Sequence, residues 1–330
     1  MSCAKVIIPG ALTTVQDFGR QGYARLGYPE CGAADRWSMQ LANTLAGNGP
    51  DSRDAVLECN LLGPTLRFDA FAVVAITGAA FAPKLDDVPV PMFAPVAVRP
   101  GQTLTVGAAS SGLRGYIAVA GGWDVPLVMG SRATDLKCGI GGIEGRFLHK
   151  DDSLPYNAAA PERAEALQAV LCDITWAHTP LHAWRVSRDH RWPVLRCVLG
   201  PQDDAFTAAG QTTFERGVYK LSADSNRMAC KLSGPAVESV QGSDILSDGI
   251  VTGSVQIASD GRPIVMLADH QTTGGYAKIA TVIPTDVDVL AQLRPGEEVS
   301  FRFVSPAEAV DIARGAAKRL AWIGEQYNVQ

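Results

Sequence analysis

The densest set of reactive side chains in this sequence lies in residues 269–280, DHQTTGGYAKIA. It combines a carboxylate, two hydroxyls, an amide and a lysine, and Gly274-Gly275 frees the backbone for positive φ or close approach to a ligand. The apolar run Ile264–Ala268 before it predicts a buried strand, so the polar groups would lie at the C-terminal end of that strand. Because loops on a rigid scaffold often carry function, we expect a binding cleft here. The alternative is an ordinary hydrogen-bonded hairpin with Lys278 in solvent.

Other acidic and basic residues occupy turn positions beside glycines. A carboxylate that faces a lysine or arginine across a cleft could do acid–base chemistry on an amide. Turn carboxylates more often bond to their own backbone, so a structural role is the better expectation for each one taken singly. The set comprises Asp35-Arg36, Glu58, Arg132 with Asp135, Gln202-Asp203-Asp204, Asp224 with Arg227, Asp248, Asp260 and Asp269.

Motifs for metals, nucleotides and nucleophiles are weak or missing. His178 and His182 have the i, i+4 spacing of a metal pair, but Pro180 separates them and no carboxylate ligand is near, so we expect no metal site. The run 139–145, GIGGIEG, misses the spacing of a dinucleotide loop, and no helix pattern follows it. Neither a GxxxxGK[ST] phosphate loop nor a GxSxG elbow occurs. The sequence leaves open a nucleophilic site assembled from residues that are distant in the chain.

The composition is that of an ordinary soluble protein. The chain has 330 residues, of which 47% are hydrophobic and 19% charged, and its net charge is −5. A nucleic-acid footprint would instead be basic and clustered. No apolar run approaches the roughly 18 residues of a membrane span, and residues 1–5 show no secretory pattern. Seven scattered cysteines without a CxxC pair favour reduced thiols in the cytoplasm.

Glycines and prolines punctuate the chain in the rhythm of short strands and turns, which predicts a mainly β protein with a few helices, arranged as barrels or sandwiches. A helix is expected near 35–46, with Asp35 as N-cap. Residues 12–23 should form a loop, and Asp203 should cap a short helix. The predicted domains are a β subdomain at 1–155, a connector at 156–192, a second β subdomain at 193–304 and a terminal helix at 305–330.

Several short motifs, in order, resemble those of the allophanate hydrolase subunit 2 family, also called the biotin-dependent carboxyltransferase or KipA family. This family includes the C subunit of the bacterial ATP-dependent 5-oxoprolinase, and the resemblance covers about residues 11–303. The motifs are Thr13–Arg20, Gly32–Arg36, Leu41–Asn43, Ala118–Gly122, Gly130–Thr134, Gly200–Asp204, Asp244–Gly249 and Gln271–Tyr276.

The resemblance implies a fold of two β-barrel-like halves related to cyclophilin. It also implies partners, a KipI-like subunit and, in the oxoprolinase, a LamB/YcsF-like subunit, with ATP used by the complex to open 5-oxoproline to glutamate. In urea carboxylase the equivalent region moves a carboxyl group from biotin to urea. This chain has no Met-Lys-Met attachment site, so biotin would arrive on another protein.

From this resemblance and the polar stretch together we predict two groups of site residues. Lys278 and Arg227 would stabilise a developing oxyanion, and Asp35 and Asp269 are the acid–base candidates. The substrate-binding residues would be Gln202, Gln271, Thr272, Thr273, Gly274, Gly275 and Tyr276. The chain departs from the family pattern at His270, Ala277, Asn226 and Cys230, which would alter substrate choice if these residues line the site.

Three functions follow as hypotheses. The first is a component of a 5-oxoprolinase-type complex that is inactive without its partners. The second is a carboxyltransferase component for urea or a related small amide. The third is a regulator that binds a KipI-like kinase inhibitor without catalysis.

Overall fold

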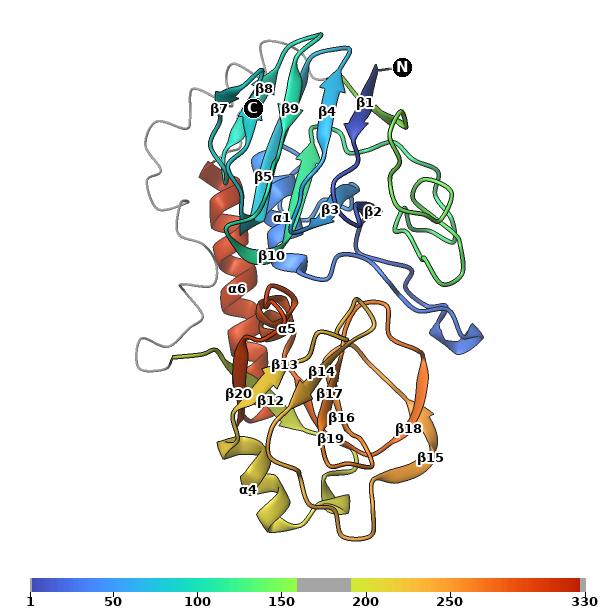
Figure 1. Ribbon diagram of the computed structural model, residues 1–330, viewed down its shortest axis with the longest axis vertical. Helices are drawn as coiled ribbons and strands as arrows, with labels where there is room; N and C mark the ends of the chain where they lie inside the picture. The colour runs from blue at the N-terminus through green and yellow to red at the C-terminus, as the bar shows by residue number, and fades with distance from the viewer. Residues whose placement is uncertain (1, 159–190, 327–330) are drawn as a thin grey trace. The chain divides into compact units, whose positions relative to one another are not determined.

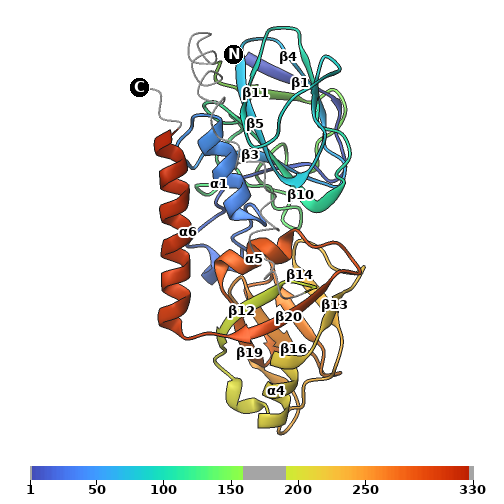
Figure 2. The ribbon, with the colours of Figure 1, turned by 90° about the vertical axis from the view of Figure 1, so that its left-hand side faces the viewer.

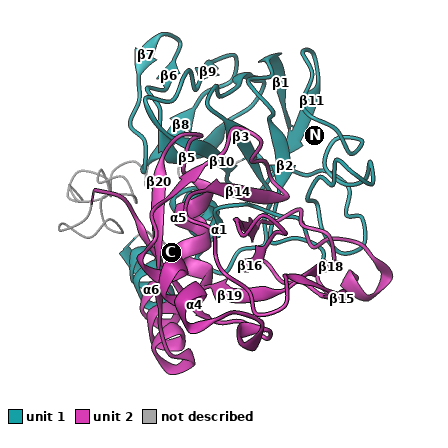
Figure 3. Ribbon diagram, turned by 60° about the horizontal axis from the view of Figure 1, so that its bottom comes forward, with its two compact units in different colours: residues 1–20, 31–180, 317–330 teal, residues 21–30, 181–316 magenta. Residues whose placement is uncertain are grey.

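The computed structural model describes residues 2–158 and 191–326. The chain divides into two compact units, which Figure 3 colours separately. Unit 1 comprises residues 1–20, 31–180 and 317–330, and unit 2 comprises residues 21–30 and 181–316. Most of the expected connector at 156–192, with His178 and His182, lies outside the described residues. Within the described ranges, no helix is both long enough and apolar enough to cross a membrane.

Unit 1 contains two antiparallel sheets that share one hydrophobic core. Ala4, Leu66 and Leu104 enter this core from the six-stranded sheet, and Leu57 and Ile117 enter it from the five-stranded sheet. In strand order, the first sheet is β11 (Ser153–Tyr156), β1 (Ser2–Ile8), β4 (Thr65–Phe68), β9 (Thr103–Thr105), β6 (Lys84–Leu85) and β7 (Val88–Pro89), and the second is β2 (Thr14–Gln16), β3 (Val56–Asn60), β10 (Ser111–Val119), β5 (Ala72–Ala80) and β8 (Pro95–Val98).

Helix α1 (Arg36–Leu45) confirms the helix expected near 35–46. Asp35 is its N-cap, in extended conformation, and its side chain accepts a hydrogen bond from the Ser38 N–H. The predicted stripe of Trp37, Leu41 and Leu45 is buried, as an amphipathic helix requires.

Unit 2 is built on a closed barrel of seven strands (Figure 1). A separate two-stranded ribbon, β15 (Asp244–Gly249) with β18 (Thr273–Tyr276), pairs antiparallel. Alternate strand residues such as Leu195, Cys197, Val255 and Val265 fill the barrel. In order around the barrel the strands are β12 (Val194–Leu199), β19 (Lys278–Val282), β16 (Ser254–Ile257), β17 (Pro263–Met266), β14 (Ala229–Ser233), β13 (Tyr219–Leu221) and β20 (Glu298–Phe303).

The predicted terminal helix is present as α6 (Pro306–Gln326), one continuous helix in Figure 2. The part from residue 317 onward belongs to unit 1, where Gly324 lies against Pro50. The other helical elements are η1 (Ala24–Leu26), η3 (Asp203–Ala205), α4 (Ala208–Arg216) and α5 (Pro284–Ala291). The mainly β fold with few helices is thus confirmed.

Two local predictions were wrong. The expected loop at 12–23 contains β2, whose three residues are buried in pairing with β3. Tertiary pairing therefore overrides the polar, glycine-interrupted pattern. Asp203 caps no helix, because it lies inside η3; the cap of α4 is Thr207, whose hydroxyl accepts the Gly210 N–H at 2.9 Å.

Candidate functional site

Lys278 is a buried lysine at the start of β19, held in an ion pair. Its ammonium lies 2.8 Å from Asp248 Oδ2, on the ribbon strand β15. The Lys278 side chain is 3% exposed and that of Asp248 is 52% exposed. The alternative of a solvated Lys278 is therefore wrong. A buried ammonium needs a paired charge, and Asp248 supplies it.

Gln202 joins both members of this pair. Its side-chain amide donates to Asp248 Oδ2 at 3.1 Å, and its Oε1 accepts the backbone N–H of Lys278 at 3.2 Å. The Gln202 backbone N–H also donates to the Lys278 carbonyl at 3.4 Å. Gln202, Asp248 and Lys278 thus form one connected polar cluster, which we call the Lys278 cluster.

Within the Lys278 cluster, Asp248 is the most exposed side chain and Gln202 is half-buried. The hydrogen bond from Lys278, with those from the Gly249 N–H and the Gln202 amide, lowers the pKa of the Asp248 carboxyl below its ordinary value. A carboxylate held ionised in this way is a weak base, so it suits the orientation of a substrate N–H better than proton abstraction. The oxyanion role predicted for Lys278 would have to act from inside an ion pair.

The remaining predicted binding residues follow the chain into the ribbon. Thr273–Tyr276 form β18 rather than an open loop, and the Thr272 carbonyl accepts the Ile250 N–H at 3.0 Å. Gln271 and Thr273 are exposed. Gly274 provides close approach, since a Cβ there would lie 2.6 Å from the Gln256 side-chain nitrogen. Much of the predicted cleft backbone is therefore already used in pairing.

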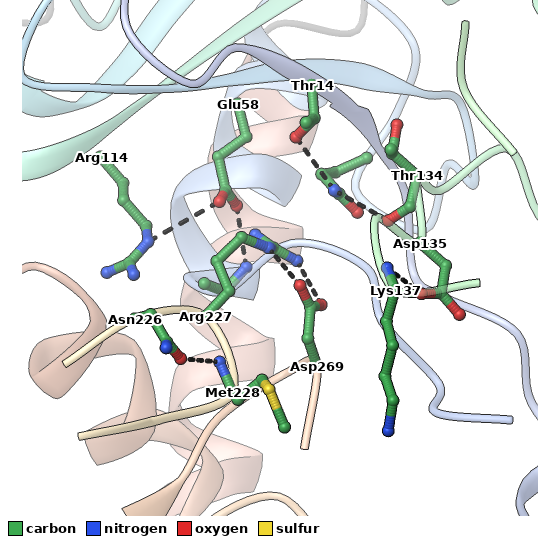
Figure 4. Close-up of polar contacts among 12 residues, drawn as sticks. Thr14, Glu58, Arg114, Thr134, Asp135, Lys137, Asn226, Arg227, Met228 and Asp269 are labelled. Carbon is green, nitrogen blue, oxygen red and sulfur yellow. Dashed lines mark hydrogen bonds and ion pairs between the residues drawn. The ribbon is translucent and has the colours of Figure 1, made fainter. Parts of the chain in front are cut away.

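Arg227 and Asp269 form a second polar group in unit 2. Arg227 Nε and Nη2 donate to the two Asp269 oxygens, each at 2.8 Å, in a bidentate pair (Figure 4). The Asp269 N–H also donates to the Arg227 carbonyl at 3.0 Å. Both side chains are largely buried, and each neutralises the other. The acid–base role predicted for Asp269 would require this pair to open, and the charge-stabilising role predicted for Arg227 would act from within the pair.

Asp35 lies in unit 1, whereas the other three predicted catalytic residues lie in unit 2. Its Oδ1 accepts the Ser38 N–H at 2.9 Å and its Oδ2 accepts the Ser38 hydroxyl at 2.6 Å. The Asp35 N–H donates to the Tyr116 hydroxyl at 2.8 Å, and Tyr116 donates to Glu58 at 2.9 Å. Burial, followed by the charges of Glu58 and Asp35, raises the pKa of Tyr116 well above its ordinary value. This geometry makes Asp35 a helix cap, and its acid–base role stays a prediction.

The sequence matches the family model of the carboxyltransferase domain, subdomains A and B, over residues 26–303. The chain belongs to this carboxyltransferase family. It is 38% identical to the C subunit of 5-oxoprolinase from Escherichia coli K12 over 321 residues, which covers 96% of this chain and 97% of that one. The Haemophilus influenzae protein of the same name is also 38% identical, over 91% of each chain.

The family likeness extends to much larger proteins. The crystal structure of the Kluyveromyces lactis urea amidolyase superposes with a TM-score of 0.84 at 28% identity. The match covers 97% of this chain and only 20% of that one. The fold is therefore that of one portion of the larger enzyme, and the family resemblance predicted from the motifs is confirmed.

The departures from the family pattern are now placed. Cys230 and Ala277 belong to the barrel core of unit 2. Asn226 accepts the Met228 N–H at 2.8 Å through its own side chain, which is the behaviour of a turn residue. His270 is buried, with Nδ1 2.6 Å from the Gln271 carbonyl. These four residues thus have structural contacts that account for their positions without a substrate.

Asp248 is the site residue that sequence reasoning undervalued, because it was grouped with ordinary turn carboxylates. The signal that could have identified it is the lysine itself, since a lysine at the start of an apolar strand requires a carboxylate nearby.

In the described part of the chain, no three His, Cys, Asp or Glu side chains are grouped as metal ligands.

Proposed function

We propose that this chain is one component of an ATP-dependent 5-oxoprolinase-type complex, which hydrolyses the cyclic amide 5-oxoproline to glutamate. The observation that carries the proposal is the 38% identity to a protein named as the C subunit of 5-oxoprolinase, over nearly the whole of both chains. Such a subunit works together with others, and the proposed partners are a KipI-like protein and a LamB/YcsF-like protein. ATP would be used by the assembled complex, and the chain would be inactive alone.

The Lys278 cluster supports this chemistry. Ring opening adds water across the bond between the lactam nitrogen and its carbonyl carbon, and the reaction needs the ring held in one orientation. Asp248 offers an ionised acceptor for the lactam N–H, and the Gln202 amide lies beside it. Lys278 keeps Asp248 ionised and fixed. Asp248 and Gln202 would therefore orient substrate, and Lys278 would position Asp248.

The test is to co-express this chain with the two proposed partners and follow ATP-dependent release of glutamate from 5-oxoproline. We expect glutamate only when all three chains and ATP are present. Asp248→Asn and Lys278→Met should each lower turnover by roughly tenfold or more. Asp260→Asn is the matched control, because Asp260 is an exposed aspartate of the same unit paired with Arg262, and it should leave turnover unchanged.

Two results of this experiment would contradict the proposal in different ways. Full activity in both cluster variants would remove the Lys278 cluster from the mechanism. A stable three-chain complex without glutamate release would contradict the oxoprolinase proposal itself. If that complex also failed to carboxylate urea with a biotin carrier protein, the regulatory hypothesis would be favoured.

A biotin-dependent carboxyltransferase for urea or a related amide is the second candidate, favoured by the superposition on the urea amidolyase structure. Carboxylation of urea by this chain, given a carboxylated biotin carrier protein, would establish it. Absence of urea carboxylation together with glutamate release in the first assay would exclude it.

A further inference from the structure

Exposed apolar side chains gather near the Lys278 cluster on the surface of unit 2. The described part of unit 2 has six exposed large apolar side chains, and four of them lie in residues 199–207 and 236–251. These are the two segments that carry Gln202 and Asp248. We call the four residues the Leu246 patch: Leu246, which is 93% exposed, Val251 at 60%, Val240 at 58% and Leu199 at 51%.

The two segments that carry the Leu246 patch lie against each other. The Val240 N–H donates to the Ala205 carbonyl at 2.9 Å, and the Thr207 hydroxyl donates to the Glu238 carboxylate at 2.7 Å. The bond from Gln202 to Asp248 joins them a second time. The four apolar residues therefore belong to one region of unit 2, and a gathering of exposed apolar side chains commonly marks a surface that binds another molecule.

Leu246 is the most exposed member of the patch, and it lies in β15 of the two-stranded ribbon beside the barrel (Figure 1). Its neighbour Ile245 packs against the barrel core. Because successive side chains of a strand point to opposite faces, the alternation turns Leu246 away from the barrel. A leucine in this position adds little to the packing of unit 2, so the stability of the fold does not account for it.

The charge around the Leu246 patch is of one sign. Residues 199–207 and 236–251 contain no lysine, arginine or histidine, and Lys278, which pairs with Asp248, is itself buried. A partner surface that carries basic groups around an apolar contact would complement this region. A second copy of the chain would instead place like charges together at a two-fold interface. The carboxylates of the two segments are Asp203, Asp204, Glu238, Asp244 and Asp248.

We propose that the Leu246 patch is the surface through which this chain binds another subunit of its complex, a protein that presents an apolar pocket bordered by lysine or arginine residues. The inference rests on the proposed function for the existence of such a partner, and it deepens that function by giving the partner a place. A subunit bound there would lie beside Asp248 and Gln202 and exclude water from the Lys278 cluster. This gives a physical reason for the proposed inactivity of the chain alone.

The experiment measures binding of the full-length chain to the KipI-like and LamB/YcsF-like proteins, singly and together, by calorimetry without ATP or 5-oxoproline. Leu246→Ser should weaken binding by about thirtyfold or more, which is the effect of losing a central anchor residue. The matched control is Leu127→Ser, because Leu127 is an apolar residue of unit 1 that is 59% exposed, and it should leave binding unchanged. Both variants should keep the wild-type urea midpoint, since neither side chain is buried.

Charge and contact are tested separately. Asp204→Lys should slow association by about 2–10-fold at low ionic strength and by less at high salt, whereas Asp87→Lys, at an exposed carboxylate of unit 1, should not. A photoreactive p-benzoylphenylalanine in place of Leu246 should cross-link to the partner. Mass spectrometry should then find lysine or arginine beside apolar residues in the cross-linked peptide.

Three results would overturn the surface. One is wild-type affinity in Leu246→Ser, or an equal loss in Leu127→Ser. Another is the absence of binding between the wild-type chain and either partner. The third is a cross-link from position 246 to unit 1 or to a second copy of this chain, which would give the patch a different occupant. A complex that assembles through Leu246 and releases no glutamate would contradict the proposed function and support this surface.

Discussion

Substitution of Asp35 separates the two roles that its carboxylate could have. Asp35→Ala removes the N-cap of α1, which costs about 0.5–2 kcal/mol. It also takes from the buried Ser38 hydroxyl the acceptor that lies 2.6 Å away, and a buried hydroxyl without its partner costs about 1–3 kcal/mol. We therefore expect the free energy of unfolding to fall by about 1.5–5 kcal/mol.

Asp35→Asn is the matched variant. Its amide oxygen can still accept the Ser38 N–H, so the cap persists. It loses the negative charge at the helix N-terminus, which is worth about 0.3–1 kcal/mol. Its amide nitrogen takes the place of Oδ2 and donates to the Ser38 hydroxyl instead of accepting from it, so the hydroxyl keeps a hydrogen-bond partner. A helix cap alone thus predicts a smaller loss of stability in the asparagine variant than in the alanine variant, and nearly normal turnover in the asparagine variant once it is assembled.

Urea denaturation followed by circular dichroism gives the free energies, and glutamate release by the co-expressed complex gives turnover. An Asp35→Ala chain as stable as the wild type would refute the capping argument. An Asp35→Asn chain that is stable but without turnover would show that the carboxylate does acid–base chemistry after all.

Four further predictions concern unit 2. Lys278→Met should raise the pKa of Asp248 toward its ordinary value of 3.8, because the hydrogen bond from Lys278 is the largest cause that lowers this pKa. The measurement is a carbon-13 NMR titration of the Asp248 carboxyl, and an unchanged pKa would show that the ion pair is unimportant. A carboxyl group whose pKa is lowered by folding contributes its full stabilisation when the pH is above its ordinary pKa. This contribution is lost as the pH falls through the lowered pKa of the folded state, so the free energies of unfolding of wild type and Asp248→Asn should converge at acid pH. Asp286→Ala removes three hydrogen bonds from Arg196 and should lower the free energy of unfolding in urea by about 3–5 kcal/mol, whereas a loss near zero would mean that solvent replaces the pair. Gly274→Ala should cost about 1–3 kcal/mol through overpacking, and an unchanged urea midpoint would show that the neighbouring side chains yield.

The fold could be predicted where local chemistry and tertiary packing agree. Asp35 and the stripe of apolar residues behind it define α1 from sequence alone, and the structure adds only the partners. Helix α5 gave no such signal, because Val287, Val289 and Leu290 are all buried, which removes the one-sided apolar pattern of a surface helix. Residues Thr14–Gln16 form strand β2 because they pair with β3. The local sequence of a segment does not show that a distant segment will pair with it.

The sequence identified residues of the candidate site by their types, but it did not show which of them pair with each other. Lys278 and Gln202 were both named from the sequence, but the residue that connects them, Asp248, is 30 positions from Lys278 and 46 from Gln202. Spacing within a stretch cannot show which distant carboxylate a buried lysine will meet. The same limit applies to Arg227 and Asp269, which were assigned separate roles and are bonded to each other across 42 positions.

The departures from the family pattern carry less weight for substrate choice than their chemistry suggested. Cys230 and Ala277 pack in the barrel core, where a change of side chain alters packing before it alters any substrate contact. Discrimination between small amides comes from polar groups that would be left unpaired by the wrong ligand. In unit 2 the polar groups that reach solvent near Lys278 are Asp248 and Gln202. Substrate choice by the Lys278 cluster should therefore change with substitutions at Asp248 and Gln202, and not with restoration of the family residues at the two core positions.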